Sequence, residues 1–306
     1  MNMKAFLLAL FTILIWGSTF AAIRASLQGG YEPGHLILVR YLIASAFFFI
    51  LLALWPGVKF SLPKKADLIK IVVLGWIGIS IYHIGVTFGM ETITAGTAGM
   101  LIGAAPIFTA LIALFILKER ISIMGWVGLM VGFTGIICIA LGSAGPALTL
   151  SKGAVFVLIS AIAVSVFFVL QKQLLSRYHP IELTAYFTCA GTLPFLFFSP
   201  GLLTSLQNAS VEAHLSALYV GIFPAAIAYV TWAVALSIGK ASSVASMMYL
   251  EPAIAILVAW IWLQEWPPTL ALIGGIIAFS GVLIVNSFGK RREEIPEITT
   301  GSTKVQ

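Results

Sequence analysis

Ionisable side chains are rare in this chain, and two of them lie inside long apolar runs. Charged residues make up 9% of the 306 residues, whereas soluble domains carry about 25%. Glu251 lies nine residues into an apolar run that begins near Ser242. That spacing places it about 14 Å along a helix, near the middle of a hydrocarbon core about 30 Å thick. Arg40 lies five residues into another such run. Because a charge at that depth is costly, both residues are candidates for a functional role.

The sequence leaves two interpretations open for each candidate. Glu251 could be a proton-coupling carboxyl, or a protonated hydrogen-bond partner that braces its helix at Pro252, since an apolar medium favours the neutral form. Arg40 could attract an anionic group such as a carboxylate, or extend to the outer lipid headgroups. His83, late in the run 68–90, could respond to protons near neutral pH or serve as a hydrogen-bonded packing residue.

Most enzyme chemistry lacks its usual residues here. Asp67 is the only aspartate, and the two cysteines, Cys138 and Cys189, lie in separate apolar runs. The apolar runs contain no paired acids, and the sequence has no His-Glu-x-x-His run and no phosphate-cradling Walker pattern. The basic residues that give the net charge of +6 are spread between the apolar runs rather than gathered in a stripe. We therefore expect no enzyme, no metal or other cofactor, no direct use of ATP and no nucleic-acid partner.

Ten apolar runs are long enough to be membrane-spanning helices, each of which needs about 20 residues. Because lipid offers no hydrogen bonds to the backbone, the fold class predicted is an all-α membrane protein. Turn and charge signals separate the runs, which cover residues 5–25, 35–55, 68–90, 95–117, 122–142, 152–174, 181–199, 214–237, 242–263 and 269–288. The polar segment 290–306 is predicted to be a disordered cytoplasmic tail.

The distribution of Lys and Arg predicts the orientation. With a cytoplasmic N-terminus, only Arg24, Arg40 and Lys152 of the 17 basic residues fall on the outer side. The positive-inside rule favours this arrangement strongly. Both termini are then cytoplasmic, as an even number of spans requires.

The two halves of the chain resemble each other at an offset of 146–147 residues. Matching positions include Tyr31 with Tyr178, Ala105-Pro106 with Glu251-Pro252, and Glu119 with Glu265. We predict two five-helix repeats, 1–145 and 146–289. Because five is odd, the second repeat enters the membrane from the opposite side, which is an arrangement typical of secondary transporters.

Small residues share this register and are predicted to pack helices closely. The matched sets are Gly125, Gly128, Gly132 and Gly135 in the first half, with Ala271, Gly274, Ala278 and Gly281 in the second. Gly85 with Gly89, and Gly99 with Gly103, are predicted to do the same. Glu119 and Glu265 end their runs at opposite membrane surfaces, where each is expected to bond neighbouring backbone or basic groups.

These residues make the chain resemble the EamA family of the drug/metabolite transporter superfamily. The resemblance covers about residues 5–288 and rests on four motifs: Ile15-Trp16-Gly17-Ser18-Thr19-Phe20, Arg40-Tyr41, Ala105-Pro106-Ile107 with Lys118-Glu119-Arg120, and Tyr249-Leu250-Glu251-Pro252 with Gln264-Glu265. It implies the ten-helix inverted-repeat fold and movement of small organic metabolites. Trp266 follows Glu265 where a basic residue is more usual, and this departure bears on neither fold nor substrate.

The resemblance also implies which helices line a central cavity. Aromatic and polar residues on those helices suit a small-molecule pocket. The predicted substrate-binding residues are Trp16, Ser18, Thr19, Arg40, Tyr82, His83, Tyr229, Trp232, Tyr249 and Glu251, of which Glu251 and His83 are also candidates for coupling.

The expected function is that of a secondary transporter in the cell inner (plasma) membrane. The expected substrate is an amino acid or a derivative, exported by alternating access. Proton antiport is one way in which this export could be driven. A multidrug or nucleotide-sugar-like exchanger is the alternative, and a passive channel is a weaker one because the loops are short. The expected partners are a small-molecule substrate, the lipid bilayer and protons, with the chain a monomer or a homodimer.

Overall fold

The computed structural model describes residues 3–54, 62–116, 121–143, 149–238, 244 and 246–288. Within these residues the chain is helical, with nine helices long and apolar enough to cross a membrane and one shorter apolar helix, Met247–Leu263. Each of the ten predicted runs coincides with one of these helices. The predicted tail, 290–306, and Glu119 lie outside the described residues.

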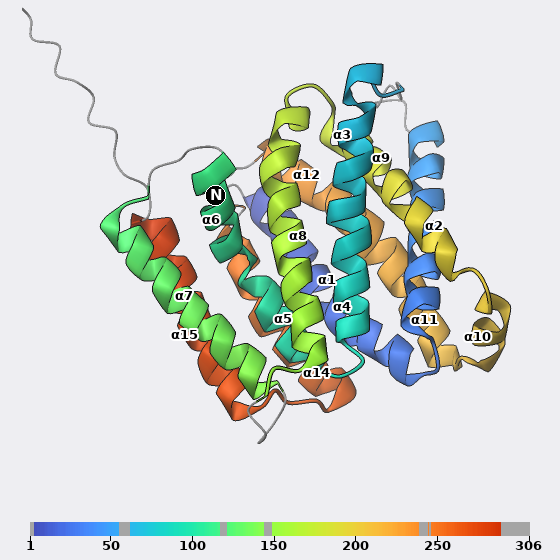
Figure 1. The fold of residues 1–306 in the computed structure, drawn as a ribbon. Coiled ribbons are helices and arrows are strands. Elements are labelled where there is room, and N and C mark those ends of the chain that lie inside the picture. The colour runs from blue at the N-terminus through green and yellow to red at the C-terminus, as the bar shows by residue number, and fades with distance from the viewer. Residues whose placement is uncertain are drawn as a thin grey trace, which may run out of the picture.

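The first five predicted runs are helical, and helices of the last five runs lie among them (Figure 1). Two of the runs are interrupted, one by the π-helical segment η1 and the other at Ala104. The elements are α1 (Met3–Gln28), α2 (Pro33–Leu54), α3 (Lys65–Gly75), η1 (Trp76–Ile81), α4 (Tyr82–Gly89), α5 (Ala95–Gly103), α6 (Ala105–Ile116) and α7 (Ile123–Gly142).

The last five runs show interruptions of the same kinds. A π-helical segment, η4, interrupts the eighth run, and a 3-10 turn, η5, precedes α14 in the ninth. The elements are α8 (Lys152–Leu175), α9 (Pro180–Thr192), η3 (Leu193–Phe198), α10 (Leu202–Asn208), α11 (Val211–Ile222), η4 (Phe223–Ile227), α12 (Ala228–Ile238), η5 (Ser246–Leu250), α14 (Glu251–Leu263) and α15 (Thr269–Phe288).

The ninth run corrects one expectation from the sequence. Glu251 was expected nine residues inside a regular helix, but it is instead the first residue of α14. Pro252 explains the break, because proline lacks a backbone N–H and is favoured in the first turn of a helix. Glu251 therefore lies where the 3-10 turn η5 passes directly into α14.

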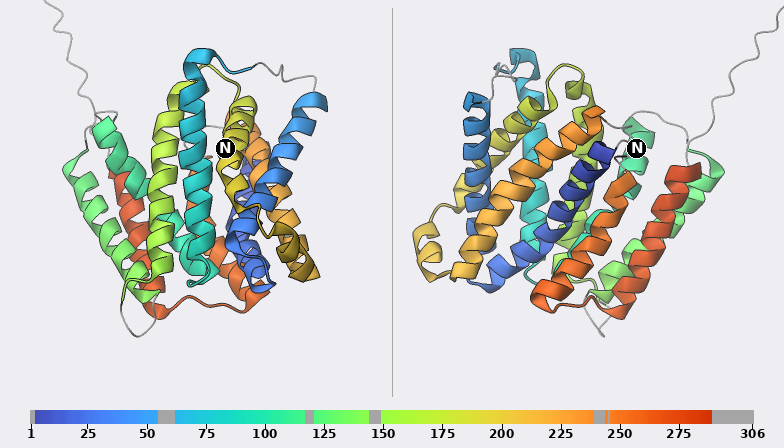
Figure 2. Two further views of the ribbon diagram at one scale, coloured as in Figure 1. Left: turned by 45° about the vertical axis from the view of Figure 1, so that its right-hand side comes forward. Right: turned by 180° about the vertical axis from the view of Figure 1, so that it is seen from behind.

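Helices α7 and α15 lie side by side along one edge of the bundle (Figures 1 and 2). A Cβ placed on Gly135 would collide with the backbone of Ala278, and one on Gly281 with the backbone of Gly132. The predicted small-residue stripe is thus confirmed as a backbone-close contact. Such a contact leaves no room for the two helices to slide past each other.

The other predicted glycines also pack helices together. Gly99 and Gly103 of α5 face Ala255 and Pro252 of α14. On α4, Gly85 faces the Ser160 side chain of α8, and Gly89 faces α8 in the same way. Helix α1 packs against both α12 and α14. These contacts place α1 against α12 and α14, and α4 against α8.

A Gly135→Ala substitution should destabilise the protein because its methyl group meets main chain that cannot rotate away. Overpacking of this kind costs about 1–3 kcal/mol. Thermal unfolding of the detergent-solubilised protein measures the effect. Gly275→Ala on α15 is the matched control, since its methyl group would meet only the flexible Met100 side chain. Equal stability of the two variants would contradict a rigid α7–α15 contact.

Candidate functional site

Arg40 of α2 is buried in the bundle, with 4% of its surface exposed. Its Nη1 lies 3.2 Å from Nδ1 of His83 on α4. Its guanidinium carbon lies 5.5 Å from the centre of the Tyr41 ring, a cation–π distance. Its Nε has no hydrogen-bond partner among the described residues. The side chain therefore points into the protein rather than out to the lipid headgroups, which removes one of the two interpretations of this residue.

His83 is buried between two tyrosines. Its ring centre lies 4.8 Å from that of Tyr41 and 4.4 Å from that of Tyr82. Because the Arg40 N–H groups can only donate, Nδ1 of His83 must accept and carries no proton in this arrangement. The ring is then the neutral tautomer with its proton on Nε2, and it holds the guanidinium in place.

An aromatic group from α1 and α12 forms a second part of the site. The Trp16 ring lies 5.5 Å from Tyr229 and 5.3 Å from Trp232. Trp16 Nε1 donates to the carbonyl of Pro224 at 3.3 Å. Pro224 belongs to the π-helical segment η4, and such segments leave backbone carbonyls in irregular positions. The three rings are half-buried, as expected for the wall of an internal cavity.

Glu251 lies within electrostatic range of both groups. The Glu251 carboxyl and the Arg40 guanidinium are each close enough to Tyr82 and Tyr229 to influence the two hydroxyls by charge. No hydrogen bond or ion pair of the Glu251 side chain is found among the residues that the structure describes. A carboxyl and a guanidinium, on opposite sides of the proposed repeat boundary, thus lie in the neighbourhood of the same two tyrosines.

The structure brings seven of the ten predicted residues into this neighbourhood. They are Trp16, Arg40, Tyr82, His83, Tyr229, Trp232 and Glu251. We refer to this set, together with Tyr41, as the central cluster. Tyr41 was missed as a site residue, although its position beside Arg40 in the sequence was a usable signal.

The other three predicted residues have different neighbours. Tyr249 packs edge-on against Phe279 of α15, with ring centres 5.9 Å apart. The Ser18 hydroxyl lies 2.6 Å from that of Tyr219 on α11. Thr19 donates to the carbonyl of Ile15 in its own helix at 3.0 Å. In the part of the chain that the structure describes, no hydrogen bond or ring contact joins these three side chains to the central cluster.

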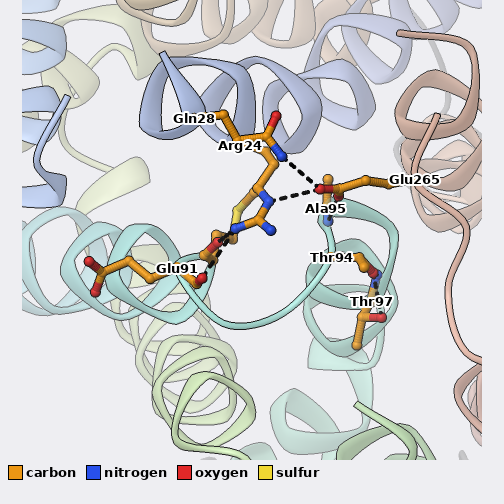
Figure 3. Close-up of polar contacts among 8 residues, drawn as sticks. Arg24, Gln28, Glu91, Thr94, Ala95, Thr97 and Glu265 are labelled. Atoms are coloured by element: carbon orange, nitrogen blue, oxygen red, sulfur yellow. Dashed lines mark hydrogen bonds and ion pairs between the residues drawn. The ribbon is translucent and has the colours of Figure 1, made fainter. Parts of the chain in front are cut away.

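A second polar group, at the end of α1 and α14, was only partly anticipated (Figure 3). Glu265 accepts from Arg24 Nε at 2.9 Å and from the backbone N–H of Ala95 at 3.2 Å. The expectation that Glu265 bonds backbone and basic groups is therefore confirmed. Its specific partner, Arg24, was not foreseen, because the two residues are 241 positions apart.

The acceptor role of His83 predicts a difference between two nearly isosteric variants. His83→Asn keeps an acceptor oxygen where Nδ1 lies, whereas His83→Leu offers Arg40 none. Leaving a buried charged donor unpaired costs about 1–3 kcal/mol, so the Leu variant should unfold at the lower temperature. Thermal melts in detergent compare the two. A Leu variant as stable as the Asn variant would contradict the role of His83.

Comparison with known proteins identifies the family. The EamA-like transporter family model matches residues 3–141 and again 151–287. An uncharacterized transporter, YdfC, of Bacillus subtilis (strain 168) is 35% identical over 280 residues, which cover 90% of each chain. A probable terminal-alkyne amino-acid exporter of Streptantibioticus cattleyicolor is 36% identical over 294 residues, covering 95% of this chain and 96% of that protein.

A solved crystal structure supports the fold. It superposes with a TM-score of 0.60 at 19% identity, over 94% of this chain and 98% of the other. The similarity in sequence to transporters extends over nearly the whole length of the chain. The chain therefore belongs to the EamA-like transporter family and is a multi-pass membrane transporter of the plasma membrane.

Proposed function

We propose that the protein exports an amino acid, or a close derivative, as a secondary transporter. The observation that carries the proposal is the buried Arg40 guanidinium, whose Nε has no partner among the described residues. A substrate carboxylate fits this group, because a guanidinium presents a planar fork that binds a carboxylate through two parallel hydrogen bonds. The ion pairs among the described residues do not involve Arg40, so the incoming anion would be its counter-charge.

The opposite end of the substrate is assigned to Glu251 and the aromatic group. An ammonium is attracted to the faces of Trp and Tyr rings, which Trp16, Tyr229 and Trp232 provide. Glu251 lies within electrostatic range of the same Tyr229 and would supply a negative charge. A zwitterion with its carboxylate on Arg40 and its ammonium near Glu251 would satisfy both charges of the central cluster.

Glu251 also gives a simple route to proton antiport. One carboxyl can hold either a proton or an ammonium, but not both, so substrate binding would release the proton and proton binding would expel the substrate. His83 takes a positioning role in this scheme, because its Nδ1 faces Arg40. The amino-acid exporter of Streptantibioticus cattleyicolor supports the choice of substrate class, since it matches this chain over nearly its full length.

Alternating access between the two faces is proposed to rest on an inverted repeat. The family model matches the chain twice. In addition, residues at equivalent positions of the two halves make similar contacts. The Tyr178 hydroxyl donates to Asp67 at 3.0 Å. At the corresponding positions, the Tyr31 hydroxyl lies 2.9 Å from Nδ1 of His214.

Several other features recur at the same offset of 146–147 residues. The π-helical segments begin at Trp76 and Phe223, and the helix breaks fall before Ala105 and Glu251. Matching residues also meet each other, as in the 3.0 Å contact between the hydroxyls of Ser45 and Thr192. Contacts between equivalent positions are expected near a pseudo-two-fold axis, and an axis in the membrane plane is the signature of inverted repeats.

The surroundings of Tyr31 and Tyr178 keep both side chains neutral. Burial raises the pKa of Tyr31, and burial is also the largest influence that raises the pKa of Tyr178. Both hydroxyls therefore retain their protons at neutral pH and remain available as hydrogen-bond donors. The contacts that support the repeat do not depend on a change of charge in either tyrosine.

Transport in liposomes tests the substrate assignment. The reconstituted protein, with a pH-sensitive dye inside, should give a saturable signal with amino acids. Arg40→Lys should lower the transport rate at subsaturating substrate by about tenfold or more, because an ammonium cannot replace the two-pronged contact. Arg177→Lys is the matched control, as Arg177 lies at a surface where its side chain is 51% exposed. Wild-type rates in Arg40→Lys would refute the carboxylate site.

Proton coupling has its own test in Glu251→Gln. The amide cannot carry the proton, so we expect a folded protein with weakened transport and no substrate-dependent dye response. Glu212→Gln is the control, since Glu212 is an exposed residue that bonds Trp262. Transport by Glu251→Gln that keeps its wild-type rate and pH dependence would exclude the proton role. Labelled uptake without any dye response in the wild type would indicate a uniporter.

A further inference from the structure

We propose that Arg24 and Glu265 form the outer gate of the transport pathway. This inference rests on the transport function proposed above and names two further residues that it requires. In this structure the pair is closed. Export would need it to open each time a substrate leaves on the outer side.

The gate joins three segments through one carboxylate and one guanidinium (Figure 3). Arg24, near the end of α1, pairs with Glu265 at 2.9 Å and donates from Nη1 to the carbonyls of Met90 at 2.5 Å and Glu91 at 3.2 Å. Gln28 donates to the same Glu265 oxygen at 3.0 Å. The connection between α4 and α5 and the connection between α14 and α15 are thereby both tied to α1.

The backbone before Glu265 is held in an unusual conformation. Gln264 has a φ of 55°. It is the only non-glycine residue with a left-handed backbone in the part of the chain that the structure describes. Side chains other than Gly, Asn and Asp adopt this region at an energetic cost. The turn directs Glu265 back toward α1, and its N–H bonds the carbonyl of Ala259 at 3.3 Å. Strain kept at a position that aims a charged side chain points to a functional demand on that side chain.

The pair lies between the central cluster and the outer end of the bundle. Arg24 is eight residues beyond Trp16 on α1, about 12 Å along the helix axis. Over that stretch α1 is in close contact with α14, because a Cβ on Gly17 would meet Ile254 at 2.6 Å. Helix α5 approaches α14 as closely, through Gly99. The Arg24–Glu265 pair thus caps a three-helix contact that separates the site from the outer face.

The chemistry of the pair suits a contact that opens repeatedly. The side chains of Arg24 and Glu265 are 20% and 14% exposed, so water can replace each partner when they separate. Ion pairs that water can reach have a small net free energy. The α7–α15 contact is different in kind. There the two backbones touch directly, and between these described helices no ion pair is present that water could replace. Moreover, Arg24 lies in the first family match and Glu265 in the second.

A cavity adjoins the connection between α4 and α5, at the end of the bundle that is predicted to face outward. Its volume is about 760 Å³, and its lining includes Glu32, His35, Phe88 and Glu91, together with residues of η3. Glu91 is also the residue whose carbonyl accepts from Arg24. The cavity and the gate therefore meet at the α4–α5 connection.

Cysteine labelling tests the gate without any substrate. The two native cysteines are replaced by alanine, and Ser18→Cys places a reporter on α1 between the gate and the cytoplasmic side. A membrane-impermeant maleimide is added to the outside of intact cells or oriented vesicles. Glu265→Gln should raise the labelling rate about tenfold, within the range expected when one contact biases a two-state equilibrium.

Two controls make the result specific. Glu212→Gln removes a different carboxylate, on α11, which accepts a hydrogen bond from Trp262 of α14. This substitution should leave the labelling rate of the Ser18→Cys reporter unchanged. Leu203→Cys, 68% exposed on α10, should label equally fast with and without Glu265→Gln. If Glu265→Gln fails to fold, Arg24→Lys replaces it, since lysine keeps the charge but loses the contacts to both carbonyls.

The two proposals fail separately in this design. Faster labelling in Glu265→Gln supports the gate even if no amino acid is transported. A labelling rate unchanged within twofold, in a folded variant, overturns the gate even if Arg40-dependent transport is observed. In that case the Arg24–Glu265 pair would be a static brace between helices.

Discussion

Arg40 carries a permanent positive charge in the interior of a helical bundle, and the central cluster is organised around that charge. Removing an ion from water costs several kcal/mol unless partners replace the water. Among the described residues the bundle replaces it only in part, with one acceptor on His83 and the face of the Tyr41 ring. A guanidinium has five donor hydrogens. An anionic ligand would therefore stabilise the buried Arg40 charge. This is the physical basis for proposing a carboxylate substrate.

Broken helices bring the remaining groups to the same region. The π-helical segment η4 positions Pro224 to accept from Trp16, and Glu251 lies at the junction between the 3-10 turn η5 and α14. Irregular backbone within a membrane protein is tolerated where it faces protein or a cavity rather than lipid. The α7–α15 pair, by contrast, is straight and in backbone contact. The chain thus combines a fixed edge with interior helices whose breaks permit local movement.

Much of the fold followed from the sequence, because a membrane span has a length and a composition that can be read directly. The small-residue stripe was equally accessible, since residues spaced three and four apart share a helix face. The sequence singled out Glu251 by its depth in the membrane-spanning run, but it did not predict the helical context of this residue. Pro252 starts a new helix, and a hydrophobic run of uniform composition hides such a break.

Side-chain direction was the hardest feature to predict. A helix that is apolar on every face gives no pattern to show which side meets its neighbours. For this reason Tyr249, which packs against α15, was grouped with the site, and Tyr41 was left out of it. Pairs such as Arg24 with Glu265 join segments from opposite ends of the chain, so only the folded structure reveals them.

Equilibrium binding tests the central claim most directly. Calorimetry on the detergent-solubilised protein would compare the amino acid most active in liposomes with its carboxamide, which keeps the ammonium and side chain but loses the negative charge. The account predicts that the carboxamide binds the wild type at least tenfold more weakly, equivalent to about 1.4 kcal/mol, and that Arg40→Lys removes most of this preference. Equal affinity of the wild type for the two compounds would contradict a carboxylate site at Arg40.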